Sequence, residues 1–257
     1  MEQILNKVAN GTIKNIIVMT GAGISTSAGI PDFRSPNTGL YSSQPEEVFS
    51  IELFRSKPQL FCTLAKRLLQ LQTQAKPTRA HWFLKALEEH KVLRRVYTQN
   101  IDGLEFACGL PSELIVQAHG GMQTASCSVC LKSYDIDQWR RKILAGKIPS
   151  CAKCQGPVKP DIVFYGEALP RRFSETLQAD FESCDLLIVM GTSLQVYPFA
   201  ALLAGVKPTV SKILINLQTT SNAHFSFEAR DYFLQTTCDA GVEALMKILT
   251  WTFPQAK

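Results

Sequence analysis

Four cysteines stand in two closely spaced pairs near the middle of the chain. Cys127 and Cys130 form the first pair, and Cys151 and Cys154 form the second, twenty residues further on. Two C-x-x-C pairs at this spacing are typical of a zinc ribbon, in which four thiolates hold the metal tetrahedrally. Four protein ligands leave no position for a water, so the pattern predicts one structural zinc. Two unrelated thiol pairs, or a disulfide framework, are the weaker alternatives.

A glycine-containing loop follows the first strongly apolar stretch. Residues 16–20 are apolar and mostly β-branched, which predicts a buried strand, and Gly21, Ala22 and Gly23 come directly after it. Glycines allow the backbone to approach a pyrophosphate, and N–H groups at a helix start favour its charge. Thr26 replaces the third glycine of the usual fingerprint, so a tight turn in any α/β protein is an equally good interpretation of this loop alone.

His119 is the candidate general base among four histidines. It lies three residues after an apolar stretch at residues 114–116 and precedes a glycine. An unperturbed imidazole pKa of roughly 6.5 suits proton transfer near neutral pH. A structural role is the alternative for His119, and we expect His81, His90 and His224 to be structural or surface residues.

Further polar residues follow predicted strands and loops, at positions where they could contact a ligand. Asn100 and Asp102 follow the second apolar strand, and Asp32, Phe33 and Arg34 end the glycine-containing loop region. Asx residues often only tie down a turn. An ordinary ion pair would explain the acid and the arginine, and core packing would explain the phenylalanine.

The elements that must position these residues alternate between strands and helices. We expect strands near 16–20, 92–97, 114–116, 161–165, 185–190, 212–216 and 232–234, and helices near 2–9, 58–72, 79–87, 171–182, 199–204 and 241–249. This rhythm predicts a mostly parallel sheet covered on both faces, with ligands at the carboxyl ends of its strands. Those ends carry Gly21–Gly23, Gln99–Asp102, His119, Gly191–Ser193 and Asn216.

Composition limits the class of protein. The chain has 257 residues, 46% of them hydrophobic and 19% charged, so one large and one small domain with a substantial core are possible and disorder is not favoured. No apolar stretch is long enough to span a membrane, and residues 1–10 do not have the pattern of a signal peptide. We therefore expect an intracellular protein, without a prediction of the compartment.

The net charge of +5 is concentrated around the cysteine pairs. Residues 127–160 contain seven cations against Asp135 and Asp137, which accounts for the whole excess. A basic zinc module that binds nucleic acid is one interpretation. A solvated surface is favoured instead, because aromatic residues are not interleaved as stacking platforms.

The ordered set of motifs resembles the sirtuins, the NAD-dependent protein lysine deacylases, and within them the deacetylase branch that includes the mitochondrial and cytoplasmic animal enzymes. The matching segments run from about Val8 to Leu249: Gly21–Ser25, Gly29–Arg34, Gln99–Asp102, His119–Gly120, the two cysteine pairs, Lys159–Val163, Gly166–Glu167 and Gly191–Ser193.

The resemblance implies a two-domain α/β fold. A Rossmann-type large domain would comprise residues 1–34, 76–120 and 158–257. A small domain would combine a helical insertion, 35–75, with a zinc-ribbon insertion, 121–157. NAD would lie between the two domains and be consumed as a co-substrate.

The resemblance also implies roles for single residues. The catalytic residues would be His119, Asn100 and Asp102. The NAD contacts would be Gly21, Ala22, Gly23, Asp32, Phe33, Arg34, Gln99, Asn100, Ile101, Asp102, Gly191, Thr192, Ser193, Asn216 and Cys238. The peptide contacts would be Val163, Phe164, Gly166 and Glu167, with a backbone pairing to the peptide at the first two.

The activity implied is NAD-dependent deacetylation of lysine in acetylated proteins or peptides, with release of nicotinamide and O-acetyl-ADP-ribose. Removal of longer acyl groups or transfer of ADP-ribose to protein are alternatives on the same fold, and a non-catalytic NAD- and zinc-binding module is a third. Neither a membrane nor nucleic acid is an expected partner, and no oligomeric state is predicted.

Four departures from the family pattern are visible. Tyr165 replaces a phenylalanine, Gly121 and Met122 replace a hydroxyl and a bulky apolar residue, and Gln218 replaces an acid. The segment between Tyr41 and Phe49 is shorter than in relatives. Because closure of this loop would exclude water from the reacting centre, we expect the shortening to affect NAD affinity or turnover.

Overall fold

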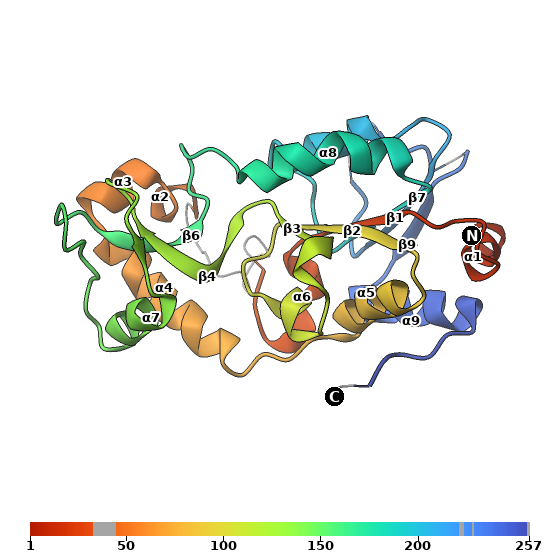
Figure 1. The fold of residues 1–257 in the computed structure, drawn as a ribbon. Coiled ribbons are helices and arrows are strands. Elements are labelled where there is room, and N and C mark those ends of the chain that lie inside the picture. The colour runs from red at the N-terminus through yellow and green to blue at the C-terminus, as the bar shows by residue number, and fades with distance from the viewer. Residues whose placement is uncertain (33–44, 221–223, 228, 256–257) are drawn as a thin grey trace.

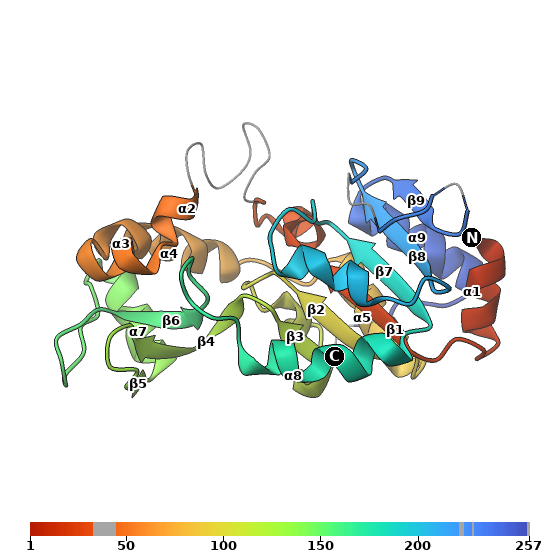
Figure 2. The same ribbon diagram turned by 90° about the horizontal axis from the view of Figure 1, so that it is seen from above.

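The computed structural model describes residues 1–32, 45–220, 224–227 and 229–255. It has two lobes, a large one containing both termini and a small one at the other end (Figures 1 and 2). The large lobe is organised on a six-stranded parallel sheet of order β3-β2-β1-β7-β8-β9. Its strands are β1 (Ile16–Thr20), β2 (Leu93–Thr98), β3 (Ile115–Gln117), β7 (Leu186–Met190), β8 (Ser211–Asn216) and β9 (Tyr232–Gln235).

This strand order is that of a Rossmann-type sheet. Counted within the sheet alone, the strands run 3-2-1-4-5-6, so the order reverses between β1 and β7. Every residue of β1 and β7 is buried, which explains why both read as continuous apolar stretches in the sequence. The predicted parallel sheet is confirmed.

Helices cover both faces of the large sheet. One face packs against α1 (Glu2–Ala9), α5 (Arg79–Glu89) and α9 (Cys238–Leu249), and the other against α8 (Arg171–Ser183) and a 3₁₀ helix, Phe199–Gly205 (Figure 1). Thr78 is the N-cap of α5 and forms a capping box with His81. Cys62, Cys108 and Cys184 are buried, as expected for ordinary core residues.

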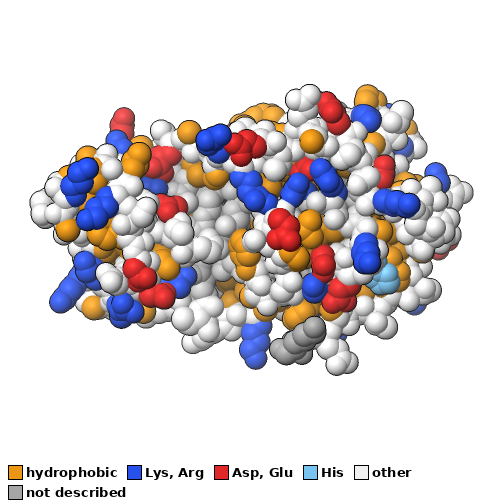
Figure 3. Space-filling model, viewed as in Figure 1, with side chains coloured by type: hydrophobic (Ala, Val, Ile, Leu, Met, Phe, Trp, Pro, Cys, Tyr) orange, Lys and Arg blue, Asp and Glu red, His pale blue; other side chains and the backbone are white. Residues whose placement is uncertain are grey.

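A second, smaller sheet organises the small lobe. Its order is β5-β4-β6, all antiparallel, with strands β4 (Gly120–Cys127), β5 (Ser133–Tyr134) and β6 (Val158–Ile162). Around it lie α2 (Pro45–Val48), α3 (Ile51–Ser56), α4 (Gln59–Gln72) and α7 (Ile136–Leu144). On the face shown in Figure 3, Lys and Arg side chains lie over both lobes, and those on the small lobe are interspersed with acidic side chains.

One sequence-based expectation is wrong here. Residues 161–165 do not start a new strand of the parallel sheet. The strand lies earlier, at 158–162, and pairs antiparallel with β4. Val158 and Ile162 are both buried in the core of the small lobe, which fixes the strand there. The small sheet thus uses residues on both sides of the predicted boundary at 157/158.

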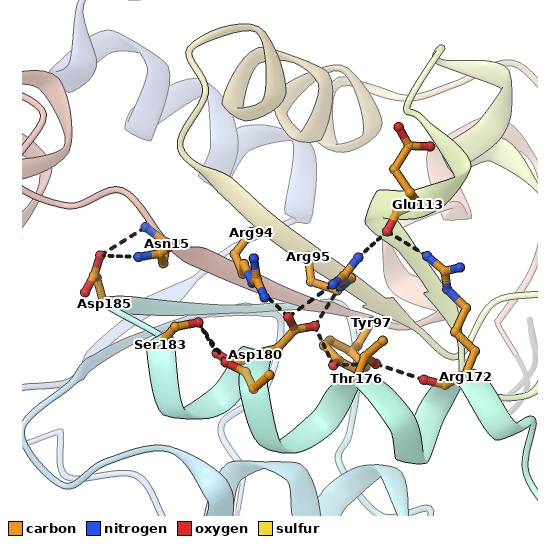
Figure 4. Close-up of polar contacts among 11 residues, drawn as sticks. Asn15, Arg94, Arg95, Tyr97, Glu113, Arg172, Thr176, Asp180, Ser183 and Asp185 are labelled. Carbon is orange, nitrogen blue, oxygen red and sulfur yellow. Dashed lines mark hydrogen bonds and ion pairs between the residues drawn. The ribbon is translucent and has the colours of Figure 1, made fainter.

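A buried carboxylate joins α8 to β2 (Figure 4). Asp180 accepts bonds from Arg94 Nε at 2.8 Å, Arg95 Nε at 2.7 Å and the Tyr97 hydroxyl at 2.9 Å. The carboxylate is fully buried, so these partners must replace the water it has lost. The short helix α6 (Leu104–Ala107) and the 3₁₀ helices Ala22–Ile24, Thr26–Ala28 and Ser112–Leu114 complete the large lobe.

Candidate active site

The reversal of strand order brings the loops after β1 and β7 into direct contact. The Gly23 N–H donates to the Gly191 carbonyl at 2.9 Å, and a Cβ added to Gly23 would lie 2.6 Å from Gly191 Cα. Gly191 also has φ +61°, a conformation that favours glycine. The structure therefore explains both glycines by backbone packing, and this packing creates the crevice edge at which Rossmann-type sheets bind dinucleotides.

Asn100 and Asp102 lie together beneath the first loop. Asn100 is buried and its Nδ2 donates to the Gly21 carbonyl at 3.1 Å. Asp102 accepts from the Ser25 hydroxyl at 2.7 Å and from the Leu104 N–H at 2.9 Å. Burial raises the pKa of Asp102, and these two donors lower it. The Asx-turn interpretation is correct for Oδ1 of Asp102, which accepts from the Leu104 N–H. Oδ2 accepts from Ser25 and so connects the segment after β2 to the glycine-containing loop.

A pocket forms where these side chains meet the small lobe. Its lining residues are Ala22, Ser25, Ile30, Pro31, Leu68, Gln72, Asn100, Ile101 and Asp102. The predicted cofactor residues Ala22, Asn100, Ile101 and Asp102 are therefore brought together. Leu68 and Gln72 contribute from α4, where a spacing of four residues places both on one helix face.

Sequence reasoning did not identify Leu68 and Gln72 as pocket residues, because their spacing also fits an ordinary core-facing helix. It also left Ser25 without a role, although its hydroxyl contacts Asp102.

His119 follows β3, and its ring is partly buried. Its Nδ1 lies 3.1 Å from the Gln99 carbonyl, so Nδ1 carries the proton and donates, which leaves Nε2 as the basic nitrogen. Burial lowers the pKa of His119, an effect that the bond to Gln99 partly opposes. The imidazole is therefore neutral near pH 7, as a general base requires.

Gln99 links His119 to the far side of the crevice. Its side-chain oxygen accepts from the Thr192 hydroxyl at 2.7 Å. Asn216 in turn donates to the Thr192 carbonyl at 3.3 Å and to the Gln218 carbonyl at 3.0 Å. The predicted positions after β2, β7 and β8 are thus joined by hydrogen bonds into one edge of the sheet.

The remaining predicted cofactor residues differ in exposure. Ser193 is exposed, whereas Cys238 is buried at the start of α9, and Asp32 is half-buried. Phe33 and Arg34 lie outside the residues that the structure describes, and so do residues 41–44 of the shortened segment between Tyr41 and Phe49.

The segment after β6 lies against His119. The Val163 N–H donates to the His119 carbonyl at 2.8 Å, and the Phe164 N–H donates to the Glu167 carboxylate at 2.8 Å. Both N–H groups of the predicted peptide-binding pair are therefore already used within the chain. Gly166 is exposed beside them, and Phe164 packs edge-on against Phe61 with ring centroids 4.9 Å apart.

Four thiols converge at the tip of the small lobe. The Sγ atoms of Cys127, Cys130, Cys151 and Cys154 all lie within 4.8 Å of one another, and the closest pairs are 3.4 and 3.6 Å apart. Thiolates around a tetrahedral zinc, with Zn–S of about 2.3 Å, are roughly 3.8 Å apart. Backbone N–H groups of Val129 and Lys153 point at two of the sulfurs, at 3.4 and 3.3 Å. The donor set and its spacing fit a structural zinc site.

Comparison with known proteins agrees with this geometry. The model of the Sir2 family matches residues 21–198, which include the crevice, His119 and all four thiols. The chain belongs to the Sir2 family. The match covers parts of both lobes, since it contains the loop after β1, the strand β7 and the whole of the small sheet.

Sirtuins from animals and yeast align with nearly the whole chain. The NAD-dependent protein deacetylase sirtuin-2 of Danio rerio is 43% identical over 98% of this chain and 72% of its own length. NAD-dependent protein deacetylase sirtuin-3 of Mus musculus is 43% identical over 92% of this chain and 72% of its own. The NAD-dependent protein deacetylase hst2 of Schizosaccharomyces pombe is 39% identical over 98% and 77%.

Proposed function

We propose that this sirtuin is an NAD-dependent protein lysine deacetylase. One observation supports this proposal above all: the neutral imidazole of His119 lies at the edge of the sheet where a Rossmann-type fold binds dinucleotides. Hydrogen bonds through Gln99 join His119 to Thr192 on the other side of the crevice. Its relatives named above are NAD-dependent protein deacetylases. NAD bound in the crevice supplies an activated ribose carbon, from which nicotinamide leaves.

Each residue of the edge has a task in this reaction. Asn100 and Asp102 hold the nicotinamide end of NAD at the pocket wall, and Gly21, Gly23 and Gly191 let the backbone approach the phosphates. Gln99 fixes the tautomer of His119, whose Nε2 takes a proton from a ribose hydroxyl. Thr192, Ser193 and Asn216 face the adenosine half.

The acetylated peptide is placed along the segment after β6. Because the N–H groups of Val163 and Phe164 are used internally, the peptide pairs with exposed backbone at Gly166, and the acyl group passes between Val163 and His119. Glu167 holds this segment in place through its bond to the Phe164 N–H. Phe33, Arg34 and Asp32 are proposed to border NAD from the other side.

The two lobes divide the work, with β6 assigned to the small lobe rather than to the large one. Residues 1–34, 76–120 and 163–257 are proposed to hold NAD, and residues 35–75 and 121–162 are proposed to form the small lobe with its zinc. Among the residues that the structure describes, no helix is long and apolar enough to cross a membrane. An intracellular location is proposed because all eight cysteines are unpaired, which a reducing compartment favours and cell fractionation tests.

The test is an acetyl-lysine peptide assay read by mass spectrometry with and without NAD. We expect free lysine and O-acetyl-ADP-ribose only with NAD, and a loss of at least 100-fold in kcat for His119→Ala, a typical contribution of a general base. His90→Ala is the matched control, since this exposed histidine stacks on Trp251 away from the crevice. Full turnover in His119→Ala would contradict the assigned role.

A further inference from the structure

Glu105 is a buried acid close to Asp102 that has no role in the proposed reaction. Glu105 in α6 is 0% exposed, and among the described residues neither of its carboxyl oxygens has a hydrogen-bond partner. His81 in α5 is equally buried, and its Nε2 is also without a partner there. Unpartnered polar atoms are costly in a protein interior, so several together call for an explanation.

These groups form one cluster with the pocket residue. A ring nitrogen of His81, a carboxylate oxygen of Asp102 and one of Glu105 lie within 4.8 Å of one another. Two carboxylates this close in a low-dielectric site cannot both be ionised without a large electrostatic cost. One of the two acids must therefore hold a proton.

Hydrogen bonding decides which acid is protonated. Asp102 accepts from Ser25 and Leu104, and both bonds stabilise its charged form. Glu105 has no comparable donor: burial, and next the charge of Asp102, raise its pKa to about 8, and the nearby Thr98 hydroxyl offsets this only in part. Glu105 is thus the neutral acid at pH 7 and Asp102 the carboxylate.

His81 supplies no positive charge to the pair. The Thr78 N–H donates to its Nδ1, so the ring proton lies on Nε2. Burial lowers the pKa of His81 to about 4, although Asp239 at the start of α9 acts in the opposite direction. The imidazole is therefore a neutral donor beside the two acids.

The other ionisable groups around Glu105 do not neutralise it. Lys85 of α5 is bonded to Glu88. Cys108, directly after α6, donates to the Glu105 backbone carbonyl, and burial raises the pKa of its thiol to about 12, so it stays neutral. Glu105 consequently faces one carboxylate, one neutral imidazole and one neutral thiol.

We propose that Glu105 is a positioning residue whose uncharged acid lets Asp102 remain ionised and fixed at the wall of the nicotinamide pocket. Thr98 connects Glu105 to a second pocket residue, Asn100. Its hydroxyl lies close to Glu105 and accepts a hydrogen bond from the Asn100 N–H at 3.0 Å. Loss of the Glu105 proton places a second charge behind Asp102 and displaces the pocket residues. This inference rests on the proposed function.

The first test compares pH profiles of kcat/KM for NAD. Glu105→Gln is uncharged at every pH, so the ratio of variant to wild-type activity is expected to rise about tenfold between pH 7 and pH 9, as the wild type ionises. Glu113→Gln, an exposed acid in the following 3₁₀ helix, is the control and keeps the wild-type profile. A ratio that does not change with pH would overturn the proposal.

The second test needs no substrate. Urea unfolding of wild type and Glu105→Gln is compared between about pH 5 and about pH 8.5. A raised pKa means that the native state holds a proton that the unfolded state releases, so wild-type stability falls relative to the variant as pH rises from about 4.5 towards about 8.

The two tests separate the two claims. An unfolding difference that is constant across this range would show that Glu105 holds no extra proton and would overturn the inference. If wild-type protein gave no NAD-dependent deacetylation at all, the proposed function would fail, and the unfolding comparison would still decide the protonation of Glu105.

Discussion

At the scale of single residues, the glycines of the first loop show how one pattern can have two causes. Gly23 and Gly191 touch backbone to backbone, and a Cβ on Gly21 would lie 2.7 Å from Thr192 Cβ. These contacts alone exclude larger side chains, whether or not a phosphate is bound. The same close approach leaves the backbone of both loops at the crevice edge, which is where a pyrophosphate needs it.

The environment of His119 determines how activity depends on acidity. Burial lowers its pKa, so the neutral base persists below the usual imidazole value. On lowering the pH from 8 to 5, we expect kcat/KM for NAD to fall only below about pH 6.5, with the loss due to protonation of Nε2. Steady-state kinetics across this range is the measurement.

The control for that profile is His90→Asn, which changes an exposed imidazole that stacks on Trp251. The acid limb should be the same in this variant as in the wild type. An acid limb centred above pH 6.5 would be inconsistent with a buried base.

At the scale of elements, Asp180 provides a buried ionic contact between α8 and β2. Replacing Asp180 by Ala leaves Arg95 and Tyr97 without their buried partner (Figure 4). Removing one member of a buried charged pair typically costs about 3–5 kcal/mol, and we expect a loss of that order in the free energy of unfolding. Urea denaturation followed by circular dichroism measures it.

A matched change on the same helix is Glu175→Ala, which removes an exposed pair with Arg171. Surface pairs of this kind contribute at most about 1 kcal/mol, so this variant should unfold close to the wild type. Equal losses in the two variants would mean that burial of Asp180 has no special energetic role.

The bounds of an element could be predicted from the sequence where its local residue pattern determines its structure. The apolar β-branched residues of β1 and β7, and the amphipathic pattern of α4, gave bounds within one residue of those observed. Residues 158–162 could not be assigned, because Lys159 and Pro160 interrupt the apolar pattern. They are buried through tertiary contacts: Lys159 Nζ donates to the Ile162 carbonyl at 2.7 Å and pairs with Glu167 at 2.9 Å.

The candidate site was predictable only where it follows strand ends or has fixed spacing. The four thiols and the polar residues after β1, β2, β3, β7 and β8 have such signals. Ser25, Leu68, Gln72 and Glu105 do not, since each of these residue types is common in helices and turns. Their roles arise when α4 and the turn at Asp102, just before α6, meet the loop after β1, a contact between distant parts of the chain.

At the scale of the whole molecule, we expect the folding of the small lobe to require a structural zinc. Its core includes Cys127, Cys151 and the fully buried Trp139, whose Nε1 donates to the Val158 carbonyl at 2.9 Å. We expect about one zinc per chain, and Cys154→Ser should lose it. Hydrogen exchange should then rise across β4, β6 and α7 while the six-stranded sheet stays protected.

Cys184→Ala is the control, because this buried thiol lies in the large lobe and should leave the zinc content unchanged. Elemental analysis of both variants decides between the outcomes. Folded protein that contains no zinc and yet protects the small sheet would refute a structural metal.

The chain passes from one sheet to the other at His119, the proposed general base. Gly120, which begins β4, is the next residue, and the Val163 N–H that follows β6 bonds to the His119 carbonyl. Mutations that adapt the small lobe to new peptides will therefore also shift the imidazole, so substrate preference and turnover should evolve together. Selecting small-lobe libraries for a new peptide and then assaying the original one would reveal this trade-off, and preference that changed freely at constant kcat would disprove it.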